Sequence, residues 1–163
     1  MLSFTEINGD VLTPNNTDRT VIVCHQVNCF GVMGAGLALQ IKQQLFPVYQ
    51  NYLEACTGRQ PEELLGKVSV CSMEKERGYS VANIFSQREH SCNGCLTQYD
   101  ALSEAFLTLN QTYPGATIRI PYLMSCGLAG GDWNIVLGLI KESFKDCHVE
   151  IWKLPARRSI TPT

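Results

Sequence analysis

The segment from Val23 to Lys42 constrains the fold of this 163-residue chain more than any other part of it. The apolar run Val21–Cys24 leads into a glycine-rich turn, and the turn leads into residues whose apolar side chains have helical spacing. A strand that passes through a tight turn into a helix is the repeating unit of open α/β sheets. The segment therefore predicts a buried central strand with a helix packed on one face of the sheet.

The turn after this strand has the properties of an anion-binding loop. Gly31, Gly34 and Gly36 let backbone N–H groups approach a ligand, and the next helix begins with unpaired N–H groups. A phosphate or diphosphate is the ligand that this arrangement favours. The pattern is not a P-loop, because no Gly-Lys-Ser/Thr follows. It is not the dinucleotide-binding fingerprint either, because the glycines have a different spacing and no acidic residue follows about 20 positions later in a second strand. A tight connection that binds nothing is the alternative.

Composition indicates one ordinary globular domain. With 45% hydrophobic and 17% charged residues, we expect a single domain over residues 1–155 and a flexible tail over 156–163. The net charge of −2 argues against binding duplex nucleic acid, which needs a basic face. No apolar run has the length of a membrane span and no signal peptide is recognisable, so we expect a cytoplasmic protein whose eight cysteines are reduced.

Apolar spacing predicts the remaining elements. Strands are expected at residues 2–7, 67–73, 79–85, 117–121 and 149–154, and helices at 36–46, 48–57, 102–109 and 132–144. Residues 74–78 are expected to form a hairpin turn, and Thr97 to cap the helix that follows it. The inward face of the last helix is predicted to carry Ile135, Val136, Leu139, Ile140 and Phe144. A hairpin combined with strand-helix-strand units predicts a mixed sheet covered by helices, in the α/β class.

A second glycine-rich loop follows the strand predicted at residues 117–121. Residues 125–133 read Ser-Cys-Gly-Leu-Ala-Gly-Gly-Asp-Trp and lead into the last predicted helix, as the first loop leads into its own helix. Two such loops at one sheet edge direct backbone N–H groups at a ligand from both sides. A clamped diphosphate is the ligand that this repetition favours.

Four segments resemble the macrodomain family, whose members bind ADP-ribose. They are residues 8–11, 25–36, 82–87 and 125–133, and the resemblance extends over about residues 2–153. The third and fourth segments are similar to the branch that includes the ADP-ribose-1''-phosphate phosphatases and the terminal ADP-ribose glycohydrolases. The resemblance implies a three-layer α/β/α macrodomain sandwich with a mixed central sheet, in agreement with the predicted elements.

The resemblance also implies which residues bind ADP-ribose. Asp10 and the N–H group of Val11 match the pair that reads adenine, and Asn28 matches the asparagine beside the distal ribose. Phe85 either lines the ligand or belongs to the core. The other ligand-binding residues implied are Met33, Gly34, Ala35, Gly36, Asn83, Gln87, Ser125, Cys126, Gly127, Leu128 and Ala129.

His25, Asn28 and Asp132 are the predicted catalytic residues. His25 resembles a histidine proposed for the phosphatase branch, and an imidazole titrates near neutrality, so it is the candidate acid or base. Its alternative role is to shape the loop by hydrogen bonding. Asp132 is a candidate for orienting water, with helix capping as its alternative.

The chain departs from the glycohydrolase pattern at two positions. Gln87 is the nearest match to a lysine of related glycohydrolases. Ala129 stands at the position where the glycohydrolase pattern has a second acid, directly after the Gly-Leu of the last loop. Glutamine cannot form the Schiff-base adduct that a lysine forms with an opened ribose. A lysine-dependent mechanism is therefore not expected for this chain.

These observations predict a monomer that binds ADP-ribose and hydrolyses a derivative at the distal ribose, with the 1''-phosphate as the first candidate. The alternatives are a reader without turnover and a hydrolase that removes ADP-ribose from proteins or nucleic acids. No cofactor and no metal are expected. His90, Cys92 and Cys95 contain a Cys-x-x-Cys spacing, but no second pair is present to complete a zinc site, so free thiols are favoured.

Overall fold

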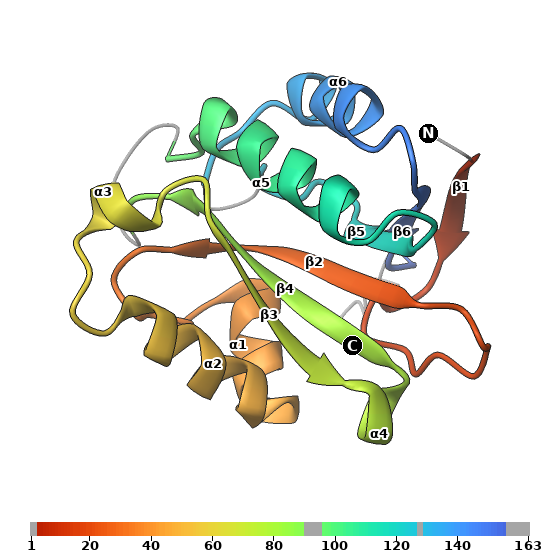
Figure 1. Cartoon of the computed structure of the whole chain (residues 1–163), viewed down its shortest axis with the longest axis horizontal. Helices are drawn as coiled ribbons and strands as arrows, with labels where there is room; N and C mark the ends of the chain where they lie inside the picture. Colours follow the sequence, from red (N-terminus) through yellow and green to blue (C-terminus); the bar gives the residue numbers. More distant parts are fainter. Residues whose placement is uncertain (1–2, 90–95, 127–128, 156–163) are drawn as a thin grey trace, which may run out of the picture.

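The computed structural model describes residues 3–89, 96–126 and 129–155. A six-stranded sheet lies between two layers of helices (Figure 1). The predicted tail and the residues His90, Cys92 and Cys95 lie outside the described residues. The strands are β1 (Ser3–Asn8), β2 (Val21–Asn28), β3 (Val68–Met73), β4 (Tyr79–Gln87), β5 (Thr117–Pro121) and β6 (His148–Lys153). The helices are α1 (Gly36–Gln44), α2 (Phe46–Cys56), α3 (Pro61–Leu64), α4 (Glu74–Arg77), α5 (Tyr99–Thr112) and α6 (Trp133–Ser143).

The strand order is β1-β6-β5-β2-β4-β3, and β3 alone runs antiparallel to its neighbour. The predicted mixed sheet with an edge hairpin is confirmed. The two strands of this hairpin, β3 and β4, are joined by α4, a single helical turn that ends at Gly78 with φ of 76°. A hairpin turn was expected there. Five parallel strands end at the same edge of the sheet, so the loops that follow them gather there.

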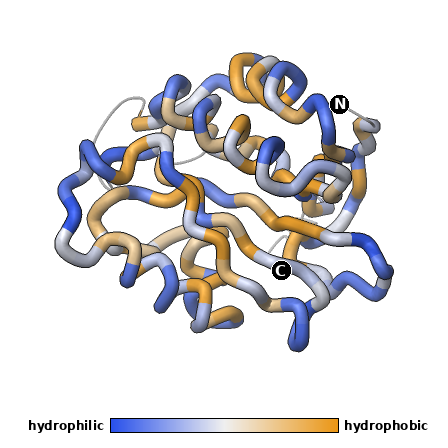
Figure 2. The backbone as a smooth tube through the Cα atoms, viewed as in Figure 1, coloured by the Kyte–Doolittle hydropathy of each residue, from blue (hydrophilic) through white to orange (hydrophobic). Residues whose placement is uncertain are grey.

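The two faces of the sheet carry separate hydrophobic cores. Ile22 and Cys24 of β2 belong to the cluster that includes residues of α5 and α6, whereas Val21 and Val23 belong to the cluster that includes residues of α1 and α2. This alternation follows from the two-residue repeat of a strand, and it explains why the central run is apolar throughout. Figure 2 shows that the segment between β1 and β2 is hydrophilic, whereas the strands of the sheet are largely hydrophobic. No helix among the described residues is long and apolar enough to cross a bilayer.

Three local predictions are wrong. Gln98 rather than Thr97 is the N-cap residue of α5, because the Thr97 hydroxyl instead donates a hydrogen bond to the Ser125 carbonyl at 2.8 Å. Ile135 is 44% exposed, so it does not share the inward face of α6. The boundary predicted between helices 36–46 and 48–57 is misplaced: α1 ends at Gln44, and α2 begins at Phe46 with Pro47 in its first turn, where a proline needs no N–H partner.

Gly78 and Gly115 offer a matched test of backbone strain and close packing. Both have left-handed backbone, but a Cβ at Gly78 would lie 2.1 Å from the Asn15 carbonyl oxygen, whereas a Cβ at Gly115 meets nothing within 4 Å. We expect Gly115→Ala to lower the free energy of unfolding by about 1 kcal/mol, and Gly78→Ala to lower it by about 2 kcal/mol. Urea unfolding of both variants measures the difference, and equal losses would contradict the close contact at Gly78.

Candidate functional site

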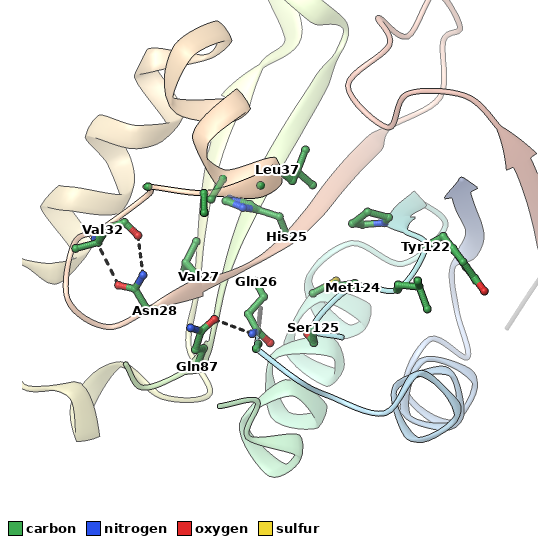
Figure 3. Close-up of a pocket in the computed structure, with 17 residues that line it drawn as sticks. His25, Gln26, Val27, Asn28, Val32, Leu37, Gln87, Tyr122, Met124 and Ser125 are labelled. Carbon is green, nitrogen blue, oxygen red and sulfur yellow. Dashed lines mark hydrogen bonds between the residues drawn. The ribbon is translucent and has the colours of Figure 1, made fainter. Parts of the chain in front are cut away.

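A cavity of about 470 Å³ opens at the carboxyl edge of the sheet, at the ends of β2 and β5 (Figure 3). The chain leaves β2 toward α1 on one face of the sheet and leaves β5 toward α6 on the other face (Figure 1). Ligands of open α/β sheets bind in the crevice between two such diverging connections, and the volume is typical of ligand pockets. The cavity is lined by His25, Gln26, Val27, Asn28, Val32, Gly34, Ala35, Gly36, Leu37, Ala38, Gln87, Pro121, Tyr122, Leu123, Met124, Ser125 and Ala129.

The first wall of the cavity is the start of α1. Ala35 is the N-cap residue in an extended conformation, no side chain caps the helix, and its first turn holds no acid. Gly36 has φ of 57°, a left-handed conformation that favours glycine at this turn. The first N–H groups of α1 are therefore without a side-chain cap beside the cavity. Met33, predicted to bind ligand, is 1% exposed, and its side chain packs in the core.

Tyr52 and Asn28 hold the loop that precedes this helix. The Tyr52 hydroxyl lies 2.7 Å from the Asn28 carbonyl oxygen and accepts hydrogen bonds from the N–H groups of Gly31 and Val32 at 3.0 and 3.1 Å. The Asn28 carboxamide donates to the Val32 carbonyl at 2.6 Å and accepts from the Phe30 N–H at 2.9 Å. Asn28 thus lines the cavity, but its side chain is engaged with its own loop. Sequence reasoning missed Tyr52, because it lies on α2, 24 positions from Asn28.

The second wall is the loop after β5. Leu123 and Ser125 have left-handed backbone, with φ of 62° and 68°. Non-glycine residues seldom adopt this conformation, and those that do gather at functional sites. The Ser125 hydroxyl oxygen is buried and has no hydrogen-bond partner among the described residues. Cys126 lies on this loop outside the cavity lining, its thiol facing the Met124 carbonyl at 3.2 Å. Gly127 and Leu128, both predicted to bind ligand, lie outside the described residues.

His25 lines the cavity from the end of β2 and is 2% exposed. Its Nε2 atom lies 2.6 Å from the Asn83 Oδ1 atom, and no described residue hydrogen-bonds its Nδ1 atom. Burial lowers the pKa of the imidazole to about 4, although the Asn83 hydrogen bond acts in the opposite direction. The expected titration near neutrality is therefore wrong. At pH 7 the ring is neutral and has one nitrogen able to accept a proton.

Two carboxamides complete the lining between these walls. Gln26 donates from Nε2 to the Gln87 Oε1 atom at 3.0 Å (Figure 3). Its own Oε1 accepts a hydrogen bond from the Ser86 hydroxyl at 2.9 Å. Gln26 was not predicted as a site residue, because its role depends on the pairing of β2 with β4. Among the described residues that line the cavity, none is an aspartate, glutamate, lysine or arginine.

Besides Met33 and Cys126, five further predicted residues lie outside the cavity lining. Phe85 stacks on Tyr52 in the core with ring centroids 5.7 Å apart, so the core alternative is correct. Asp132 caps α6 by accepting the Asn134 N–H at 2.8 Å, as its alternative role required. Asn83 is fully buried behind His25. Asp10 and Val11 follow β1, which β5 and β6 separate from β2.

No protein-family model matches this chain. The chain is 27% identical over 139 residues to proteins named DNA ADP-ribosyl glycohydrolase from Mycobacterium tuberculosis and Mycobacterium bovis. The matched region covers 85% of this chain and 38% of those proteins. The chain therefore spans well under half the length of these curated relatives.

Solved structures share the fold over almost the whole chain. A protein of unknown function from Bacteroides thetaiotaomicron has a TM-score of 0.80 at 23% identity, over 93% of this chain and 98% of that one. DarTG of Thermosipho africanus, solved in complex with ADP-ribose, has a TM-score of 0.74 at 22% identity, over 99% of this chain and 44% of that one. The macrodomain of Mycobacterium tuberculosis DarG has a TM-score of 0.72 at 26% identity, over 91% of this chain and 96% of that one. The sheet order, the pair of loops and these likenesses agree that the chain has the macrodomain fold, as the resemblance in its sequence predicted.

Proposed function

We propose that this macrodomain binds the ADP-ribose unit in the cavity at the ends of β2 and β5, with the diphosphate between the two glycine-rich loops. The observation that carries the proposal is the uncapped start of α1, which borders a cavity without charged side chains among its described lining. Backbone N–H groups and the positive end of a helix dipole bind phosphate oxygens without needing a cationic side chain. The unpartnered buried atoms of His25 and Ser125 support a polar ligand, because such atoms are ordinarily hydrogen-bonded.

The sheet order supports one orientation of ADP-ribose, with its adenine toward β1 and its distal ribose over β2 and β4. Asp10 is exposed at the end of β1, and one of its carboxylate oxygens accepts the Leu12 N–H at 2.9 Å. An adenine placed toward β1 meets this carboxylate, which can accept from the exocyclic amine, and the Val11 backbone. The distal ribose then lies over β2 and β4, near His25 and Gln87. The ADP-ribose in the Thermosipho africanus structure and the activity named for the mycobacterial relatives support this class of ligand.

Hydrolysis at the distal ribose is the second candidate function, and His25, which lines the cavity, is the candidate base. A water molecule that attacks the anomeric carbon loses a proton, and a neutral imidazole accepts it while the leaving group departs with the bonding electrons. The low pKa of His25 makes it a poor general acid at pH 7. The leaving group is a phosphate in the 1''-phosphate ester, and a nucleobase or protein side chain in an ADP-ribosyl adduct.

Calorimetry with ADP-ribose and with AMP tests the binding proposal, and the absence of ADP-ribose binding would overturn it. Three substrates then separate the hydrolase candidates: ADP-ribose-1''-phosphate, ADP-ribosylated single-stranded DNA and protein ADP-ribosylated on a carboxylate. We expect turnover of one of them by the wild type and at least a hundredfold slower turnover by His25→Ala, within the range of acid–base contributions. Tight binding without turnover of any substrate would favour the alternative in which the protein binds ADP-ribose and catalyses no hydrolysis.

Removal of the Tyr52 hydroxyl tests whether the first loop must be ordered. Tyr52→Phe removes the acceptor of the Gly31 N–H group and the nearer of two acceptors of the Val32 N–H group, so we expect a loss of about 2 kcal/mol in stability and about tenfold weaker ADP-ribose binding. Tyr49→Phe is the matched control on the same helix, since no hydrogen bond joins its hydroxyl to another described residue. Equal effects in urea unfolding and calorimetry would contradict the role of Tyr52.

A further inference from the structure

His25, Asn83 and Ser69 lie in one row across three neighbouring strands. The register of the sheet pairs His25 of β2 with Asn83 of β4, and Asn83 with Ser69 of β3. Asn83 is fully buried and His25 is 2% exposed, so water does not compete for their hydrogen bond of 2.6 Å. Only His25 of this row lines the cavity. Asn83 therefore acts on a ligand only through the imidazole.

Two residues of the row, Ser69 and Asn83, donate hydrogen bonds to Asn51 of α2. The Ser69 hydroxyl donates to Asn51 Oδ1, and the same oxygen accepts from Asn83 Nδ2 at 3.4 Å. The Asn83 amide group is thereby turned toward Asn51, and its Oδ1 faces His25 Nε2. An amide oxygen can only accept, so Nε2 must carry the hydrogen. In the neutral ring Nδ1 then carries a lone pair and no hydrogen.

We propose that Asn83 is a positioning residue that holds His25 in the Nε2–H tautomer, so that Nδ1 accepts a hydrogen bond from a hydroxyl of the bound ligand. The Nδ1 atom of this cavity-lining ring has no protein partner among the described residues, although buried polar atoms are ordinarily hydrogen-bonded. It has almost no exposed surface, so its neighbours must move slightly before a donor reaches it. The ligand group is a hydrogen-bond donor, and a ribose hydroxyl has this chemistry whereas a phosphate oxygen does not. The proposal rests on the proposed function, since it assigns one donor of the ADP-ribose unit to His25.

Nitrogen NMR of the imidazole rings tests the tautomer directly in the wild-type protein. The chain has only three histidines, so the signals of His25 can be assigned by His25→Gln. We expect the Nε2–H tautomer between pH 6 and pH 8, and a shift of the Nδ1 signal when ADP-ribose is added. An Nδ1–H tautomer, or an Nδ1 signal unchanged by bound ADP-ribose, would overturn the proposal. A wild type that binds no ADP-ribose while showing the expected tautomer would instead overturn the proposed function.

Two substitutions of Asn83 distinguish a role in positioning His25 from a role in folding. Asn83→Ala removes the acceptor, and we expect about tenfold weaker ADP-ribose binding at every pH together with a mixture of tautomers. Asn83→Asp keeps an acceptor oxygen but adds the carboxylate that stabilises an imidazolium, in which Nδ1 also carries a hydrogen. Ser69, Asn51 and the described residues of the cavity lining carry no other charge that would mask this carboxylate.

For Asn83→Asp we expect wild-type affinity at pH 9 and about tenfold weaker binding at pH 6, where the imidazolium forms. Asn134→Asp is the control, because it makes the same substitution at an exposed residue of α6 outside the cavity lining. A merely structural role of Asn83 would weaken binding by the same factor at both pH values, and that result would overturn the proposal. If both Asn83 variants fail to fold, the wild-type NMR measurement decides the question alone.

Discussion

Ala35→Asp is expected to stabilise the protein and, at the same time, to weaken ADP-ribose binding at least a hundredfold. Ala35 occupies the N-cap position of α1 with extended backbone, and it offers no side-chain acceptor to the first N–H groups of the helix. Aspartate is among the best N-cap residues, so we expect a gain of about 1 kcal/mol in the free energy of unfolding. The same carboxylate lies where we place the diphosphate, and like charges brought together destabilise a complex by several kcal/mol.

Ala35→Ser separates the two effects of that substitution. Serine caps the helix without adding a charge, so we expect a similar gain in stability and a much smaller loss of affinity. Urea unfolding and calorimetry with ADP-ribose measure both quantities on the same samples. Unchanged affinity in the aspartate variant would show that the diphosphate does not lie at the start of α1. Because stability is expected to rise, a loss of binding in this variant cannot be attributed to unfolding.

Acidification from pH 7 to pH 4 is expected to remove about 3 kcal/mol of stability through His25 alone. Burial lowers the pKa of this imidazole from 6.5 to about 4 in the folded protein. Between these two values the unfolded chain binds the proton and the folded chain does not, so the free energy of unfolding falls as the pH falls. Each pH unit in this window contributes about 1.4 kcal/mol. Above the unfolded pKa both states are neutral and the contribution to stability no longer changes.

Comparison of the wild type with His25→Gln isolates this contribution from that of the carboxylates. We expect the stability difference between the two proteins to change by about 3 kcal/mol between pH 7 and pH 4, in favour of the variant at low pH. His148→Gln serves as the control for the loss of an imidazole, since His148 lies in β6 and bonds the Ser3 hydroxyl. A stability difference that is the same at both pH values would show that the folded protein protonates His25 as readily as the unfolded chain.

The order of strands and helices could be predicted from the sequence because each signal is local. The apolar run of β2, the glycine turn and the spacing of Leu37, Ile41 and Leu45 specify a strand, a loop and a helix within about 20 consecutive residues. The same holds for β5, its loop and α6. Both glycine-rich loops are therefore recognisable in the sequence as ligand-binding candidates, and residues of both line the cavity.

The tertiary structure decided what the side chains near these loops do. His25 and Asn83 are 58 positions apart, and only the register of β2 against β4 brings them within 2.6 Å. Phe85 alternates onto the α1–α2 face of β4 and so belongs to the core, while Asp132 is the N-cap residue of α6. Local sequence determined the fold class and the loops, because periodicity and turn chemistry act over a few residues. The protonation state of His25 was decided by burial and by a partner from another strand, both of which exist only once the sheet has formed.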